Sequence, residues 1–450
     1  MHRAPISVSA AALTLALAAA GCGGSDDDPD TITVAYQDYG AFQAAHSLFE
    51  KVKEEFEAEN PGTTVELRPI EAPPEDYQAQ VNLMNQSPSE APDIIYEDTF
   101  TINQDVDAGY LLPIDDYWDA WPDAEQYNDR ADAGVTALDG SRYGVMLGTD
   151  TRGLWYNTAL LEQAGVEVPW EPETWDDVLE AARAVRAEHG DAVAPLNLYS
   201  GTPAGEMASM QGFQMLLSGT GDALYDEESR EWITGAPGFL DSLEFVRTVY
   251  TEDLGLDPQD ALNPTVSTIN NEERFPSGEL AISLEGSWAT QSWIESANQP
   301  WPEWSDTMAF AAMPTRDGGD PGTTSMSGGW ALSLGAASTN PDLAWEVMAH
   351  ALNLENATKF AVEGAQIPLR GDVAASEEFT ASDPNPDLAT ELVDVTHFRP
   401  AYGEYPRVSL AIQEAMEAVM LGDATPEEAA ATYAQEVEGI VGADNVRQGG

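Results

Sequence analysis

The alternation of strand-like and helix-like segments along the chain is the feature that most restricts its fold. Residues 31–36 (TITVAY) have the apolar, β-branched character of a strand, and apolar residues then recur at helical spacing over 45–56, up to an Asn-Pro-Gly sequence. An alternating strand-like stretch follows at 63–70, then a polar helical stretch at 77–84 and a short apolar strand at 92–98. Strand-helix-strand units of this length predict an α/β fold with a parallel sheet covered by helices on both faces.

The rest of the chain continues this alternation. A strand-like segment beginning at Gly148 (GTDTRGLWYN) leaves the first unit. Thr174 and Asp177 have the spacing of a capping box, and an apolar face follows them at helical spacing. The strongest helix of the last third covers 406–420. A chain of 450 residues is long enough for two domains.

The only cysteine of the sequence, Cys22, ends an apolar leader that starts with the positive charge of Arg3. The apolar run is shorter than the roughly 20 residues that cross a bilayer, so its layout is that of a secretory signal. It resembles the bacterial lipobox, which implies cleavage before Cys22 and attachment of lipid to it. An ordinary cleaved signal with an incidental cysteine is the alternative. We expect a signal peptide over 1–21 and a flexible, charged spacer over 22–30.

The charge balance limits the possible partners. The 79 acidic residues outnumber the 18 basic ones and give a formal net charge of −61. Such a surface repels nucleic acid, because binding to phosphates depends on Lys and Arg. The acids are scattered along the chain, so we interpret them as a solvated surface. A saline habitat and a generally acidic exported proteome are both compatible with it.

The sequence lacks the usual signatures of catalysis. The five histidines lie far apart and have no metal-binding spacing, and no cysteine follows Cys22 to act as a nucleophile. The segment SMSGG at 325–329 lacks the leading glycine of a nucleophile elbow. Pairs of carboxylates carry no weight among so many acids. We therefore expect no catalytic residue, no metal and no cofactor.

Several aromatic residues stand beside glycines, where a helix or strand core does not require them. Trp288 lies in ISLEGSWAT, Trp330 in SMSGGWALSL, and Tyr402 and Tyr405 in RPAYGEYPR. Glycine lets a ligand and the backbone approach a ring, and rings with a few convergent polar groups are typical of a small-molecule site. A pyranose fits this description, because its C–H faces are apolar and its rim carries hydroxyls. Packing in the core is the alternative for each ring.

Four segments, together with the lipobox, resemble the extracellular solute-binding proteins of ABC importers, in the sugar-binding branch that includes maltose-binding protein. They cover 144–182, 278–289, 328–352 and 364–373, in the order expected for that family. The resemblance implies a two-lobed periplasmic-binding-protein-like α/β fold with a ligand cleft between the lobes. It places the first lobe at 31–148 and 314–377 and the second at 152–312 and 378–450. Crossings near Thr149–Thr151 and Met313–Pro314 would then act as hinges.

The resemblance also implies ligand contacts. Asp150 lies seven residues before Asn157, where the family has an acid that binds sugar hydroxyls. Arg152 has the same strand parity, so it would donate to the ligand or form a structural pair with Asp150. Trp288 matches a stacking tryptophan of the family. The remaining expected contacts are Asp38 and Tyr39 after the first strand, Asp98 and Thr99 at the end of the 92–98 strand, Trp330 at the cleft floor, and Tyr402, Tyr405 and Arg407 in the late segment.

These observations predict a receptor anchored by lipid to the extracellular face of the cell membrane. It would capture a mono- or oligosaccharide and deliver it to the permease subunits of an ABC transporter. We expect a monomer that binds no nucleic acid. A receptor for a polyol or a glycoside and an exported glycoside hydrolase lipoprotein are the alternatives.

Overall fold

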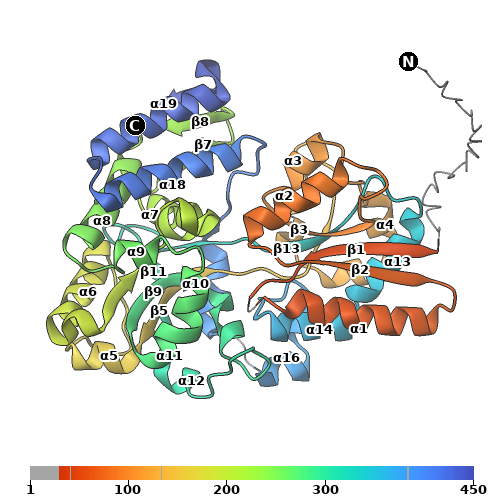
Figure 1. Cartoon of the computed structure of the whole chain (residues 1–450), viewed down its shortest axis with the longest axis horizontal. Coiled ribbons are helices and arrows are strands. Elements are labelled where there is room, and N and C mark those ends of the chain that lie inside the picture. The colour runs from red at the N-terminus through yellow and green to blue at the C-terminus, as the bar shows by residue number, and fades with distance from the viewer. Residues whose placement is uncertain (1–29, 41, 133, 383–384, 450) are drawn as a thin grey trace, which may run out of the picture.

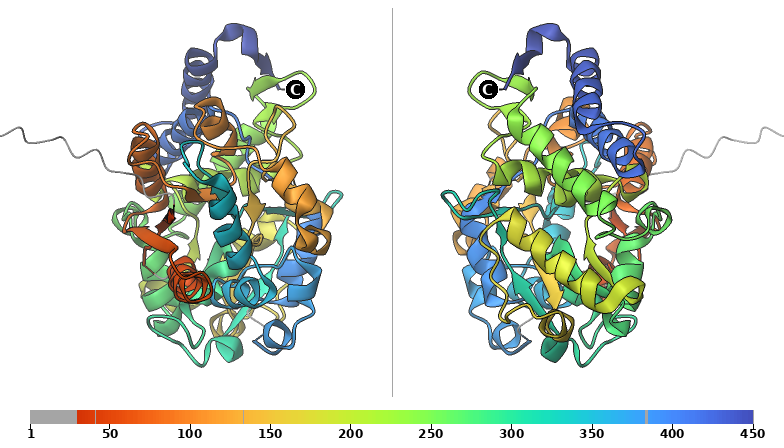
Figure 2. Two further views of the ribbon diagram at one scale, coloured as in Figure 1. Left: turned by 90° about the vertical axis from the view of Figure 1, so that its right-hand side faces the viewer. Right: turned by 90° about the vertical axis from the view of Figure 1, so that its left-hand side faces the viewer.

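The computed structural model of the chain describes residues 30–40, 42–132, 134–382 and 385–449 (Figure 1). The segment expected to be a signal peptide (1–21) and Cys22 lie outside these residues. Within the described part, no helix has both the length and the apolar character needed to cross a membrane. The described chain forms two α/β lobes, each with its own hydrophobic core. Figure 2 views the molecule from its two ends, with the first lobe toward the viewer on the left and the second on the right.

The first lobe is built on a five-stranded sheet of order β2-β1-β3-β13-β4. Strand β1 pairs in parallel with β2 and β3, as expected from the sequence. The late strand β13 enters between β3 and β4 and runs antiparallel to both, so the sheet is mixed and not purely parallel. The strands are β1 (Thr31–Gln37), β2 (Thr64–Ile70), β3 (Ile94–Asp98), β4 (Val145–Met146) and β13 (Trp330–Leu334).

Helix α1 of the first lobe buries the apolar stripe that the sequence predicted. In α1, Leu48, Phe49, Val52 and Phe56 are buried at helical spacing against the sheet. Helix α16 packs on α14, since Phe379 contacts the small cluster of Ala357, Ala361 and Val373. The helices are α1 (Ala44–Glu59), α2 (Pro74–Asn85), α3 (Ile102–Asp107), α4 (Asp115–Ala120), α13 (Pro341–Ala351), α14 (Leu354–Glu363), α15 (Gly371–Ala374) and α16 (Glu377–Ser382).

The second lobe has a four-stranded sheet of order β10-β5-β9-β6 and two smaller sheets of order β11-β12-β14 and β15-β8-β7. Strand β5 runs antiparallel to β9, and Trp155 on β5 is fully buried. The strands are β5 (Arg152–Asn157), β6 (Ala194–Asn197), β7 (Tyr225–Asp226), β8 (Glu231–Thr234), β9 (Leu280–Gly286), β10 (Met308–Ala311), β11 (Met313–Pro314), β12 (Thr323–Met326), β14 (Thr396–His397) and β15 (Val446–Gln448).

Two predicted helices of the second lobe are confirmed. Thr174 and Asp177 form the capping box of α6, and α18 covers the 406–420 segment. The helices are α5 (Thr158–Gln163), α6 (Trp175–His189), α7 (Met215–Gly219), α8 (Pro237–Thr251), α9 (Pro258–Ala261), α10 (Val266–Ile269), α11 (Phe275–Ser277), α12 (Trp304–Thr307), α17 (Asp387–Glu391), α18 (Tyr405–Leu421) and α19 (Pro426–Val441), with π-helices at Ala208–Gln214 and Asn270–Arg274.

The chain passes between the two cores at Thr149–Thr151 and again at Ser327–Gly329. The second passage differs from the expected crossing at Met313–Pro314. Strands β11 and β12 form a hairpin, and Met313 and Met326 both pack in the core of the second lobe. The chain therefore enters the first lobe only after Met326, where Ser327, Gly328 and Gly329 lead into β13.

Candidate ligand-binding cleft

A cavity of about 420 Å³ lies between the lobes. The first lobe contributes Tyr96, Asp98 and Trp330 to its lining, and the second lobe contributes Gln211 and Trp288. Asp150 and Arg152, at the first crossing, line it as well. The cavity thus joins rings and charged groups from both halves of the chain in the arrangement of a small-molecule site.

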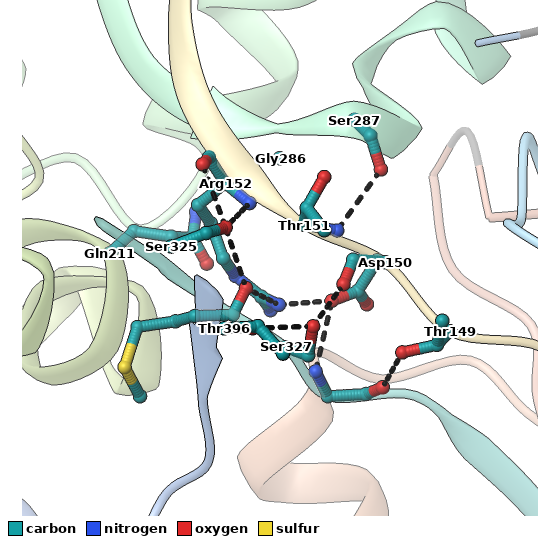
Figure 3. Close-up of polar contacts among 12 residues, drawn as sticks. Thr149, Asp150, Thr151, Arg152, Gln211, Gly286, Ser287, Ser325, Ser327 and Thr396 are labelled. Carbon is teal, nitrogen blue, oxygen red and sulfur yellow. Dashed lines mark hydrogen bonds and ion pairs between the residues drawn. The ribbon is translucent and has the colours of Figure 1, made fainter. Parts of the chain in front are cut away.

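Asp150 and Arg152 form a buried ion pair at the crossing (Figure 3). Arg152 Nη1 donates to Asp150 Oδ1 and, at 3.1 Å, to the carbonyl of Met326. The backbone N–H of Gly328 donates to the same Asp150 oxygen at 3.0 Å. Burial lowers the pKa of Arg152, while the charge of Asp150 acts in the opposite direction. The expected structural pair therefore exists, and both of its members also face the cleft.

Trp288 follows the end of β9 and lies beside this pair. Its ring packs under the Arg152 guanidinium, whose Cζ is 4.4 Å from the ring centroid. A Cβ on Gly286 would lie 2.1 Å from the Trp288 ring, so the glycine is needed for the ring to fold back over its own backbone. From the sequence we expected this glycine to let a ligand approach the ring. In the structure, the missing side chain of Gly286 instead leaves room for the ring of Trp288, which lines the cavity.

Trp330 opens β13 and forms a second aromatic wall. It stacks on Tyr96 with centroids 4.4 Å apart and an interplanar angle of 6°. Its backbone pairs with Asp98 across the β3–β13 ladder. Offset aromatic pairs of this kind hold their rings in one orientation. Trp330 and Tyr96 thus present a fixed apolar surface to the cavity.

The sequence did not identify Arg399, which links the two lobes at the cavity. Its Nη2 lies 2.9 Å from Asp98 of the first lobe, and its Nη1 lies 3.5 Å from Glu206 of the second. Its Cζ is 4.1 Å from the centroid of Phe100. Burial by itself would lower the pKa of Arg399, but the charges of Asp98 and Glu206 raise it by a larger amount. The pKa of Arg399 therefore lies above its usual value. Burial raises the pKa of Asp98, and Arg399 opposes that shift.

None of the three contacts predicted from the late segment lines the cavity. Tyr402 packs on Tyr225, with centroids 4.2 Å apart, and donates its hydroxyl to Glu227. Tyr405 is fully buried, but its hydroxyl donates to the cavity-lining Glu206, so it supports the cleft from behind. Arg407 lies exposed in the first turn of α18. The role given to Arg407 has no support in the structure, and Arg399 lines the cleft in its place.

Of the four contacts expected at the ends of the first and third strands, two line the cavity. Tyr39 and Asp98 line the cavity, whereas Asp38 and Thr99 do not. Asp38 accepts a hydrogen bond from Gln43 at 2.8 Å, and its neighbour one residue on, Tyr39, takes the cavity position. Thr99 is buried, and its N–H donates to the Gly329 carbonyl at 3.2 Å. Thr99 therefore joins the first lobe to the second crossing.

Amide side chains complete the polar lining. Each can donate and accept, which suits a ligand whose rim carries hydroxyls. Their sequence surroundings have no motif that would have identified them. They are Gln37, Gln211, Gln291, Gln366 and Gln413.

The chain is similar to known binding proteins along most of its length. Residues 40–358 match the family described as bacterial extracellular solute-binding protein. An ABC transporter solute-binding protein from Thermotoga lettingae, solved with α-D-tagatose, is 24% identical with a TM-score of 0.75, and the match covers 91% of this chain and 99% of that one. The GacH receptor of Streptomyces glaucescens, solved unliganded and with acarbose, is 23% identical with a TM-score of 0.74, covering 92% and 98%.

A lactose-binding protein of Rhizobium radiobacter is 23% identical over 251 residues, which is 54% of each chain. The structural matches confirm the predicted α/β fold with two lobes. Because the family match covers most of the described residues, the chain belongs to the bacterial extracellular solute-binding proteins.

Proposed function

We propose that this protein is the sugar receptor of an ABC importer. The observation that carries the proposal is the cavity between the lobes, where the Trp288 and Trp330 rings stand beside the hydrogen-bonding groups of Asp98, Asp150 and Arg152. Apolar rings match the C–H faces of a pyranose, and carboxylate, guanidinium and amide groups match its hydroxyls. The relatives that bind α-D-tagatose, acarbose and lactose support a saccharide as the ligand class.

The family is one of solute-binding proteins, so the chain binds its ligand without converting it. A receptor for a polyol or a glycoside would use the same groups and is the alternative within this class. The aromatic walls favour a ring-shaped ligand over a linear polyol, because stacking needs a flat apolar face.

We also propose that the two lobes close on the ligand about the crossings at Thr149–Thr151 and Ser327–Gly329. Such a hinge supports function because a ligand that touches both lobes stabilises the closed arrangement by its difference in affinity. Each lobe would consist of the residues that pack around its own hydrophobic core. The chain would return from the first lobe to the second after α16. The lipid on Cys22 would tether the receptor outside the cell, next to the permease subunits.

A thermal-shift screen of neutral mono- and disaccharides tests the function. A ligand at about 100 times its Kd stabilises the native state by about 2.7 kcal/mol. We expect at least one saccharide to raise the melting temperature and to decrease the radius of gyration in small-angle scattering. A screen in which linear polyols bind and no cyclic saccharide does would favour the alternative. Turnover of a chromogenic glycoside would contradict the receptor function.

A further inference from the structure

The charged groups that line the cleft are unequal in number, and both arginines are paired with acids. Asp76, Asp98, Asp150 and Glu206 line the cavity, against two arginines, Arg152 and Arg399. The lining therefore has an excess of two negative charges. The molecule around it carries a further strong excess of acids.

Each arginine is already paired with an acid, although the buried Nε of Arg152 has no hydrogen-bond partner among the described residues. Arg152 donates to Asp150, and Arg399 lies 2.9 Å from Asp98 and 3.5 Å from Glu206. The side chains of Arg152 and Arg399 are each only 6% exposed. Removing a partner from a buried ion pair leaves an uncompensated charge, which is strongly unfavourable. A ligand carboxylate that took the place of Asp150 or Asp98 would remain beside the displaced acid.

The acids, in contrast, have unused acceptor oxygens. The hydrogen bonds to Asp98 from Phe100 and Arg399 both end on Oδ1, and those to Asp150 from Arg152 and Gly328 also end on Oδ1. No hydrogen bond from the described residues reaches Oδ2 of either acid. These two oxygens can accept from a sugar hydroxyl or from a protonated amine.

The two ion pairs are also neighbours. Both arginines lie close to Gly328: a Cβ added to this glycine would be 3.3 Å from Arg399 Nη2 and 3.7 Å from Arg152 Nη2. Their charges therefore act on a ligand in the same part of the cleft. At short range in a partly buried site, the interaction of like charges is strong.

We propose that the cleft selects saccharides by charge: it admits neutral and amine-bearing sugars and rejects sugars that carry a carboxylate, sulfate or phosphate group. The proposal rests on the sugar-binding function and narrows its substrate class. The groups that carry the selection are Asp98 and Asp150, which offer open acceptors and hold both arginines.

The test uses matched probes and isothermal titration on the mature protein. Two hexose sets consist of glucose and galactose with their 2-amino and 6-carboxylate counterparts. A disaccharide set consists of cellobiose, chitosan disaccharide and cellobiouronic acid. In every set that yields binding, we expect the uronate to bind about tenfold or more weakly than the neutral sugar, and the amine to bind at least as well as the neutral sugar. A uronate that binds as tightly as its neutral counterpart overturns the proposal and leaves the sugar-binding function intact.

Failure of every probe and of every other neutral saccharide would instead overturn the sugar-binding function and this proposal with it. Asp98→Asn tests the source of the selection, because it removes one cleft charge and the nearer of the two acid partners of Arg399. We expect the ratio of neutral-sugar to uronate affinity to fall at least threefold in this variant. Asp119→Asn, on the exposed side of α4, is the control and changes the total charge equally. Equal effects of the two variants would show that the selection comes from the overall charge and would overturn the role of the cleft.

Discussion

The guanidinium of Arg152 lies over the ring of Trp288, with Cζ 4.4 Å from the ring centroid. The same guanidinium donates to Asp150, which also accepts from the backbone of Gly328 at the second crossing. Asp150, Arg152 and Trp288 therefore form one connected unit at the point where the chain passes between the lobes. A substitution at any of them should alter the orientation of the others.

Trp288→Ala is expected to weaken binding of the sugar found in the screen by about tenfold or more. The substitution removes the apolar face for the ligand and the ring that holds Arg152 by a cation–π contact. Trp288→Phe keeps an aromatic face and should weaken binding less. Isothermal titration measures both effects, with Trp345→Ala, a half-buried tryptophan outside the cavity, as the control. Wild-type affinity in Trp288→Ala would contradict the stacking role.

Asp150→Ala should lower both the affinity for sugar and the free energy of unfolding. A charge-assisted hydrogen bond contributes about 1.5–3 kcal/mol, so we expect a roughly 10- to 100-fold loss of affinity. The unliganded protein should also lose stability, because Arg152 becomes a buried charge without its partner. Denaturant unfolding and titration separate the two effects. If stability falls while affinity is unchanged, Asp150 is only a structural residue.

The sequence predicted the elements of the first lobe well, because each has its own periodic pattern. Strands β1, β2 and β3 and helix α1 lie close to the predicted ranges. The second crossing was misplaced because β11 and β12 are two and four residues long and have no recognisable period. Only the packing of Met313 and Met326 in the core of the second lobe shows that the chain has not yet crossed.

The site was predicted in part for a similar reason. Asp150, Arg152 and Trp288 lie in segments whose order and spacing resemble the family, and all three line the cavity. Arg399 and Arg407 stand at the two ends of RPAYGEYPR, and nothing in that segment tells which of them faces inward. The choice depends on α18, which begins at Tyr405 and leaves Arg407 exposed.

Gly329→Ala should destabilise the protein and disturb closure. Gly329 has φ +144°, and a Cβ there would lie 2.6 Å from the carbonyl of Gly148, which directly precedes the first crossing. Such strain costs about 1–3 kcal/mol. Gly403→Ala is the control, because a Cβ there meets no atom within 4 Å. Thermal unfolding and scattering with and without sugar measure the effects, and identical behaviour of the two variants would exclude a special role for Gly329.

Cys22→Ser tests the lipid anchor. If lipid is attached to this residue, the wild-type protein should partition into detergent and the variant should remain in the aqueous phase, because each buried CH₂ of an acyl chain contributes about 0.8 kcal/mol. The melting temperature of the two proteins in aqueous buffer should agree, since Cys22 precedes the first strand by several residues. Equal partitioning of both proteins would contradict the anchor.

Two buried acids in the first lobe should make stability depend on pH. Glu97 accepts from the Thr101 hydroxyl, and Asp105 accepts from Gln78 Nε2 at 2.8 Å. Both carboxyl groups are fully buried, and Glu97 Oε2 and Asp105 Oδ1 have no hydrogen-bond partner among the described residues, so a proton on one of the acids would reduce the repulsion between them. Burial raises the pKa of Glu97 above its usual range and that of Asp105 to about 6.

Because the folded state holds protons at a pH where the unfolded chain has released them, this pair stabilises the fold most at low pH. Its contribution should fall as pH rises from about 4 through about 6 and above, by up to about 1.4 kcal/mol per pH unit for each proton. Glu97→Gln is neutral at every pH, and its amide can donate to Asp105, so the variant should show a shallower decline and greater stability near pH 8. Denaturant unfolding from pH 4 to 8 measures this, with the exposed Glu188→Gln as the control. Parallel curves for wild type and Glu97→Gln would show that the pair carries no shared proton.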